Sequence, residues 1–127
     1  MRRQAAISLL TVAILFIGAW TGQAAADAVL GKAYFAGGCF WCMEEAFEKV
    51  EGVLSVTSGY MGGTVANPSY EDVSAGRTGH AESVEVVYDP KVVSYEQLVE
   101  YFWRTIDPTT KDRQFCDAGS PYRTGIF

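Results

Sequence analysis

The sequence has few of the residues that metal-dependent and nucleic-acid-binding proteins use. It holds one histidine, and its 10 lysine and arginine residues are outnumbered by 15 aspartate and glutamate residues, which gives a net charge of −5. This acidic balance, without a basic stripe, argues against binding to nucleic acid or to an anionic membrane surface. A phosphate-binding glycine fingerprint and a Walker motif are also absent from the sequence.

Cysteine is scarce too, but the number of cysteines is informative. The chain has three, so at least one thiol has no partner within it. Hydrophobic residues make up 49% and charged residues 20% of the chain, which is typical of a packed globular domain. Without repeats, low-complexity segments or linkers, 127 residues indicate one domain, which we expect to be a monomer.

Residues 1–26 have the pattern of a secretory signal peptide. A basic start is followed by an uncharged, mostly apolar run at 5–20 and by small residues at 24–26, which suit cleavage after Ala26. An uncleaved anchor is the alternative, although a membrane span needs about 20 apolar residues. No cysteine follows the run, so a lipoprotein anchor is not indicated.

We therefore expect an exported protein, periplasmic or extracellular, whose mature chain has no stable membrane association. Its functional domain covers residues 27–127 and keeps all three cysteines. Because such compartments are oxidising, the cysteines either form structural disulfides or change redox state as part of the function.

The hydropathy pattern of this domain predicts the order β-α-β-β-α-β. Strands are expected at 29–36, 53–58 and 82–88 and from 122 onward, helices at 39–50 and between a cap at Ser94 and Asp107, and a long glycine-rich loop at 59–79. This order predicts an α/β (α+β) two-layer sandwich with a ferredoxin-like core, in which both helices cover one face of an antiparallel sheet. The last strand ends at Phe127, so we expect a domain that is incomplete at its C-terminus.

The expected turn from the first strand to the first helix carries two of the cysteines. Gly37 and Gly38 permit a tight turn, and Cys39 falls at the helix N-terminus, where free N–H groups and the helix dipole stabilise a thiolate. Cys42 lies three residues on, on the same side of the helix. The pair is either a nucleophile with its resolving partner, or a structural disulfide or two buried thiols.

Three further residues could complete a reactive site around this turn. Phe40 and Trp41 could line a small apolar pocket for a methyl group or thioether, or could be ordinary core residues. Glu82 has the strand parity of Val84 and Val86, at the end of an apolar row. A carboxyl group there is poorly solvated, so its pKa rises and it could act as a general acid; otherwise it is a strand-end carboxylate that faces water.

Other polar residues are weaker candidates. The loop residues Tyr60 and Tyr70, together with Asp117 and Tyr122, could contact a ligand or merely pack. His80 could complete a Cys₃His zinc site, but structural zinc ligands usually come in two close pairs. We therefore expect His80 to shape the turn before the third strand, with no metal.

Six short motifs resemble, in the same order, those of the A-type peptide methionine sulfoxide reductases. They are Gly38-Cys39-Phe40-Trp41, Gly59-Tyr60-Met61-Gly62-Gly63, Asn67-Pro68-Ser69-Tyr70, Gly79-His80-Ala81-Glu82, Tyr88-Asp89-Pro90 and Asp107-Pro108-Thr109. The resemblance spans essentially the whole expected mature chain. It implies an α/β two-layer fold and the reduction of the S epimer of methionine sulfoxide, free or in oxidised proteins. It also implies electrons from a thioredoxin-type donor and no cofactor.

The resemblance also implies a role for each matching residue. Cys39 is the nucleophile that attacks the sulfoxide sulfur, and Glu82 is the acid that protonates the departing oxygen. The remaining matches are the phenols of Tyr70 and Tyr122, which hydrogen-bond that oxygen, Asp117, which orients the substrate, and Phe40 and Trp41, which hold its methyl group. A sulfenic acid then forms on Cys39 and condenses with a second thiol to a disulfide.

The chain departs from the family pattern in two places. Family members usually continue well past the position of Phe127, and some carry resolving cysteines there. The stretch before Asp117 also reads Gln114-Phe115-Cys116, where many members have a glycine and an asparagine. The resolving thiol is therefore Cys116 or Cys42. We favour Cys116, because a disulfide needs Cα atoms within about 7 Å and a helix barely brings residues three apart that close.

Three other functions remain open at the level of sequence. Cys39 and Cys42 could serve a thioredoxin-like disulfide oxidoreductase, which would need neither Glu82 on an apolar face nor the two aromatic residues. The chain could be a zinc-stabilised or binding module. It could also be an inactive, truncated relic of a reductase.

Overall fold

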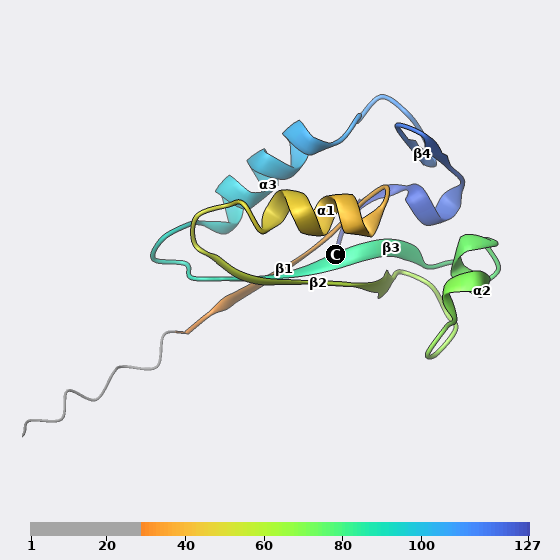
Figure 1. The fold of residues 1–127 in the computed structure, drawn as a ribbon, viewed down its shortest axis with the longest axis horizontal. Helices are drawn as coiled ribbons and strands as arrows, with labels where there is room; N and C mark the ends of the chain where they lie inside the picture. The colour runs from red at the N-terminus through yellow and green to blue at the C-terminus, as the bar shows by residue number, and fades with distance from the viewer. Residues whose placement is uncertain (1–28) are drawn as a thin grey trace, which may run out of the picture.

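The computed structural model describes residues 29–127, so the expected signal peptide at 1–26 lies outside the described residues. Two helices, α1 (Phe40–Phe47) and α3 (Tyr95–Thr105), lie on one face of a four-stranded sheet (Figure 1). This is the expected two-layer α+β sandwich. No helix among these residues has the length and apolar character needed to cross a bilayer.

The sheet has the strand order of the ferredoxin-like arrangement. Its strands are β1 (Gly31–Gly37), β2 (Val53–Met61), β3 (Ala81–Tyr88) and β6 (Thr124–Ile126). They follow the order β2-β3-β1-β6, and every neighbouring pair is antiparallel. The prediction from the element order is confirmed, and β1 lies in the middle of the sheet, so its C-terminal end is well supported.

Aromatic rings hold the helix layer to the sheet. The ring of Phe35 on β1 stacks on Phe47 of α1 at 4.9 Å and on Phe102 of α3 at 5.0 Å between centroids, and all three residues are fully buried. Ser94 caps α3 in a capping box with Gln97, as the sequence predicts. Burying these rings fixes both helices against β1, and with them the turn that joins β1 to α1.

The segment at 59–79 is more ordered than the sequence predicts. β2 runs three residues further than expected, to Met61, because those residues pair with the start of β3. A short helix, α2 (Tyr70–Ser74), follows, and the side-chain oxygen of its N-cap, Ser69, accepts a hydrogen bond from the Asp72 N–H. Because the segment is rich in glycine, its sequence predicts a loop and does not reveal this strand extension.

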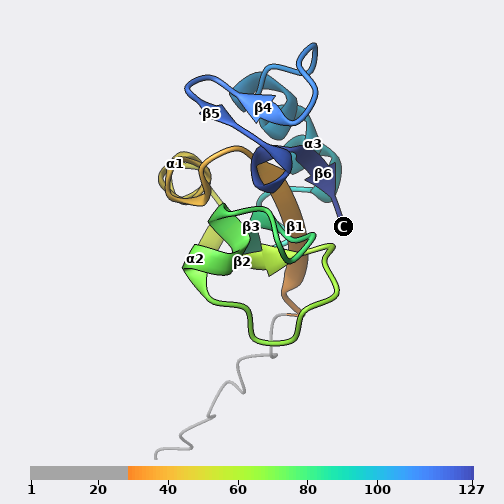
Figure 2. The same ribbon diagram turned by 90° about the vertical axis from the view of Figure 1, so that its right-hand side faces the viewer.

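The expected polar loop after α3 also contains structure. It folds into the strands β4 (Arg113–Gln114) and β5 (Asp117–Ala118) and the 3-10 helix η1 (Ser120–Tyr122), which precede β6 (Figure 2). Gln114 anchors this segment from a buried position. Its amide donates to the Asp107 carbonyl at 2.8 Å and to the Thr124 hydroxyl at 3.0 Å, and its oxygen accepts from the Asp107 N–H at 2.7 Å.

Candidate active site

The turn between β1 and α1 places Cys39 at the N-cap of the helix. Gly38 has a φ of +90°, and a Cβ on it would lie 2.6 Å from the Cβ of Gln114. A Cβ on Gly37 would lie 2.7 Å from Cγ2 of Ile106. Both glycines are therefore required, one for its backbone conformation and both for close packing. The predicted tight turn is confirmed, and it leaves the Cys39 side chain partly exposed.

Glu82 lies beside the same turn, in the interior. It is 2% exposed, and its Oε2 accepts a hydrogen bond of 3.1 Å from the N–H of Phe40, the first residue of α1. Burial raises the pKa of this carboxyl group, the Phe40 N–H opposes the rise, and the charge of Asp117 adds to it. The predicted burial of Glu82 and the predicted direction of its pKa shift both agree with the structure.

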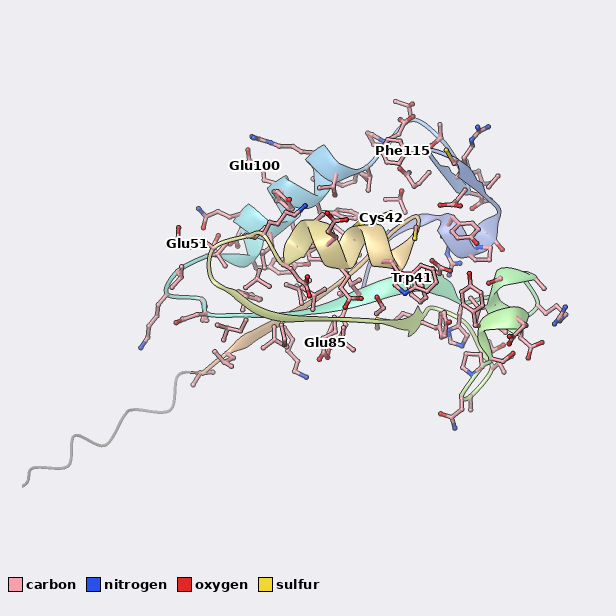
Figure 3. The ribbon with its side chains drawn as sticks, viewed as in Figure 1. Trp41, Cys42, Glu51, Glu85, Glu100 and Phe115 are labelled. Atoms are coloured by element: carbon pink, nitrogen blue, oxygen red, sulfur yellow. The ribbon has the colours of Figure 1, made fainter. Side chains whose placement is uncertain are left out.

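Aromatic side chains surround the first turn of α1. The ring of Phe40 lies 5.3 Å from Trp41, 5.6 Å from Tyr60 and 6.4 Å from Tyr70 between centroids. Trp41 stacks on Tyr70 at 6.2 Å and points from α1 towards α2 (Figure 3). Phe40 is buried, whereas Trp41 is 62% exposed. Together the rings form an aromatic wall with one solvent-facing indole.

The remaining expected site residues come from other elements, and the charged groups among them act on Tyr122. Burial raises the pKa of the Tyr122 phenol, and the charges of Glu82, Tyr70, Asp117 and Cys39 raise it further. Tyr122 comes from η1, Asp117 from β5 and Tyr70 from α2. The fold thus brings all five expected catalytic residues to one end of the sheet, where β1 ends and α1 begins.

A pocket of about 400 Å³ opens on the other side of Cys39 and contains all three cysteines. They are free thiols, and Cys42 and Cys116 are exposed. The other residues that line the pocket are Gly37, Met43, Ala46, Thr105, Gln114, Phe115 and Asp117. Figure 3 shows Cys42 and Phe115 on this side of α1, opposite Trp41. Both expected resolving candidates therefore share a pocket with Cys39.

The environment of Cys42 holds it in the thiol form. Burial raises the pKa of the Cys42 thiol, a hydrogen bond with Cys39 and the charge on that residue raise it further, and Asp117 and Glu45 add smaller contributions. Cys39 and Cys42 line the same pocket, which agrees with the expectation that they lie on the same side of the helix. A raised pKa lowers the thiolate fraction of Cys42 while Cys39 is reduced, and only a thiolate attacks.

His80 holds the loop before β3 in place through two hydrogen bonds of its ring. Its Nδ1 accepts a hydrogen bond of 3.1 Å from the Gly63 N–H, so its Nε2 carries the proton that it donates to the Val65 carbonyl at 2.8 Å. The expected role in shaping this turn is confirmed. Within residues 29–127, no three or more histidine, cysteine or acidic side chains are grouped as ligands for a metal ion.

The sequence does not predict the surroundings of two residues of this region, Gln114 and Tyr60. Gln114 reads as one polar residue in a polar segment, and nothing local marks it as buried. Tyr60 was grouped with loop residues because the expected strand stopped at Ser58. The alternation of β2, carried two residues further, would have placed Tyr60 on the helix-covered face with Val56.

Comparisons with known proteins identify the family and agree with the fold. A family model described as peptide methionine sulfoxide reductase matches residues 31–127. The peptide methionine sulfoxide reductase MsrA of Methanococcoides burtonii is 56% identical over 96 residues, which are 76% of this chain and 63% of that protein. The MsrA of Ligilactobacillus salivarius is 55% identical over 95 residues, which are 75% and 55% of the two chains.

Solved structures show the same likeness. Methionine sulfoxide reductase A of Corynebacterium diphtheriae matches with a TM-score of 0.75 at 40% identity, over 77% of this chain and 46% of that chain. Reduced Mxr1 from Saccharomyces cerevisiae matches with a TM-score of 0.72 at 34% identity, over 77% and 59% of the two chains.

The described residues thus form a ferredoxin-like α+β domain, with a cysteine at the N-cap of α1 and a buried carboxyl group beside the first turn of that helix. The chain belongs to the peptide methionine sulfoxide reductase family. It spans 55% to 63% of the length of the two curated relatives compared above.

Proposed function

We propose that this protein reduces methionine S-sulfoxide, in oxidised proteins or free, to methionine, and so repairs oxidised proteins. The observation that carries the proposal is the position of Cys39 and Glu82 on either side of the first turn of α1. The thiol is partly exposed to a substrate, and the carboxyl group is buried with a raised pKa. A nucleophile and a proton donor are the two groups that sulfoxide reduction needs.

In the proposed reaction, the Cys39 thiolate attacks the sulfoxide sulfur while Glu82 gives its proton to the sulfoxide oxygen. This attack joins the two sulfur atoms. The protonated oxygen then moves to Sγ of Cys39 as its bond to the substrate sulfur and the sulfur–sulfur bond both break, which leaves the thioether and a sulfenic acid on Cys39. Tyr70 and Tyr122 hydrogen-bond the oxygen, and Asp117 orients the substrate. The aromatic wall of Phe40 and Trp41 suits the substrate methyl group because it offers apolar contact and no charge.

The sulfur of a second thiol then attacks the sulfur of the sulfenic acid, and a disulfide forms. The hydroxyl group of the sulfenic acid leaves as water, together with the proton of the attacking thiol. We propose Cys116 as this resolving thiol and a thioredoxin-like dithiol as the reductant that restores both thiols, with no cofactor. Cys116 lines the same pocket as Cys39, and it lies in the β4–β5 connection outside the helix. The alternative, Cys42, lies three residues after Cys39 on α1, where a helix barely brings the two Cα atoms within the distance of about 7 Å that a disulfide needs.

A stereospecific assay on residues 27–127 tests the proposed function. The purified chain is given dithiothreitol and either the S or the R epimer of methionine sulfoxide, and methionine is measured. We expect turnover of the S epimer alone. Reduction of insulin disulfides without any sulfoxide reduction would instead support a disulfide oxidoreductase that uses Cys39 and Cys42.

A further inference from the structure

Tyr60 and Glu82 are partners in the sheet. They lie directly opposite each other in the register of β2 and β3. Side chains of directly opposite residues lie on the same face of the sheet, with Cβ atoms about 4.5–5.5 Å apart. That face carries the helices, because Val56 on β2 and Val84 on β3 point into the core from it. The Tyr60 ring therefore stands next to the Glu82 carboxyl group.

Tyr60 also lies on the side of Glu82 that faces the edge of the sheet. Among residues 29–127, β2 is an edge strand, and no further strand of this part of the chain covers that side of Glu82. Tyr60 is half-buried, packs against the core and lies 5.6 Å from the Phe40 ring. The other groups that act on Glu82 are the Phe40 N–H from α1 and Asp117 from β5, and Glu82 in turn acts on Tyr122 of η1, which also feels Tyr70 of α2 and the N-cap residue Cys39.

We propose that Tyr60 is a positioning residue of the active site, whose ring keeps water away from the Glu82 carboxyl group on the β2 side. The inference rests on the proposed function only in giving Glu82 the role of the acid. Since the Phe40 N–H at the helix N-terminus favours the ionised carboxylate, exclusion of water has to outweigh it for the group to hold a proton. Burial raises the pKa of the Tyr60 phenol as well, which fits a shared dry environment.

The test removes the ring and follows the proton on Glu82. Tyr60→Thr and Tyr60→Ala delete the ring, and threonine is the better strand former of the two. Tyr60→Phe keeps the ring without the hydroxyl group. The matched control is Tyr101→Ala, because Tyr101 is also half-buried against the core but lies on α3, where it contacts Phe47 and the Ala46 carbonyl.

Two measurements are made on each variant. One is the pH profile of a single turnover of methionine S-sulfoxide. The other is the carboxyl titration of Glu82 by ¹³C NMR in a Cys39→Ser background, which needs no activity. We expect loss of the ring to move the alkaline limb and the Glu82 midpoint down by about one pH unit, a tenfold loss of the protonated form above the midpoint.

Tyr60→Phe should leave both midpoints in place, and Tyr101→Ala should lower stability without moving either. A Glu82 midpoint that is unchanged in both ring-deleted variants would overturn the inference, as would an equal shift in Tyr60→Phe. If the unaltered chain reduces no sulfoxide, the proposed function fails, while the NMR titration still decides the role of Tyr60.

Discussion

At the scale of single residues, two opposing effects act on the pKa of Glu82. Burial favours its protonated form, whereas the hydrogen bond from the Phe40 N–H favours its carboxylate. The net effect raises the pKa of the group, so more of it holds a proton near neutral pH than in an exposed glutamate. As a proton donor, Glu82 is competent below its pKa and is lost as the pH rises through it.

Glu82→Gln should therefore slow the first turnover by about 10²- to 10⁴-fold at neutral pH, the usual contribution of a general acid. The variant should also lose the alkaline limb that Glu82 causes, because glutamine does not titrate. Rapid-mixing measurements of methionine formation over a range of pH check both effects. A variant with the unaltered rate and profile would remove Glu82 as the acid.

Cys39→Ser should abolish reduction of the S epimer, since a serine hydroxyl group is a far weaker nucleophile than a thiolate. Cys42→Ser is the matched control, because it removes a neighbouring thiol from the same pocket. The control should still complete the first turnover. Methionine release with dithiothreitol is the measurement, and wild-type turnover by Cys39→Ser would show that the nucleophile is another group.

At the scale of elements, the β4–β5 connection carries Cys116 to the pocket of Cys39. Cys116→Ser should stop turnover driven by thioredoxin but leave the first turnover intact, because the sulfenic acid then has no resolving partner. The oxidised protein is also digested, and its disulfide is mapped by mass spectrometry. Finding Cys39 joined to Cys42 in the unaltered chain would reverse our assignment of the resolving thiol.

The turn before α1 leads to a prediction about stability. Gly38→Ala places a Cβ against Gln114 at a φ of +90°, so it should lower the free energy of unfolding by about 1–3 kcal/mol and reduce activity. Gly59→Ala is the control, because nothing lies within 4 Å of its added Cβ. Urea unfolding and the sulfoxide assay compare the two. Equal stability of both variants would contradict the need for glycine at 38.

At the scale of the whole molecule, we propose that the chain is exported and cleaved after Ala26. Expression of the full chain in a bacterium should yield a periplasmic or secreted product that begins at Asp27. Cell fractionation and N-terminal sequencing check this, and a version without residues 1–26 should stay in the cytoplasm. Recovery of an intact N-terminus in the membrane fraction would favour the anchor instead.

Much of the fold could be predicted because its signals are local. The alternation of β3 placed Glu82 beside Val84 on the buried face, and the cap at Ser94 marked the start of α3. The end of β2 and the buried position of Gln114 were missed, since both depend on partners far along the chain. Met61 is a strand residue only because it pairs with Ala81, and Gln114 is buried only because Asp107 and Thr124 satisfy its amide.

The sequence by itself determined the element order, the Gly-Gly turn, the helix-capping position of Cys39 and the apolar face that holds Glu82. These follow from backbone sterics and from side-chain periodicity, which act over a few residues. Only the tertiary structure decided which groups surround them. It gathered the three thiols in one pocket and put Tyr60 opposite Glu82, because strand register and helix packing are set by contacts between distant segments.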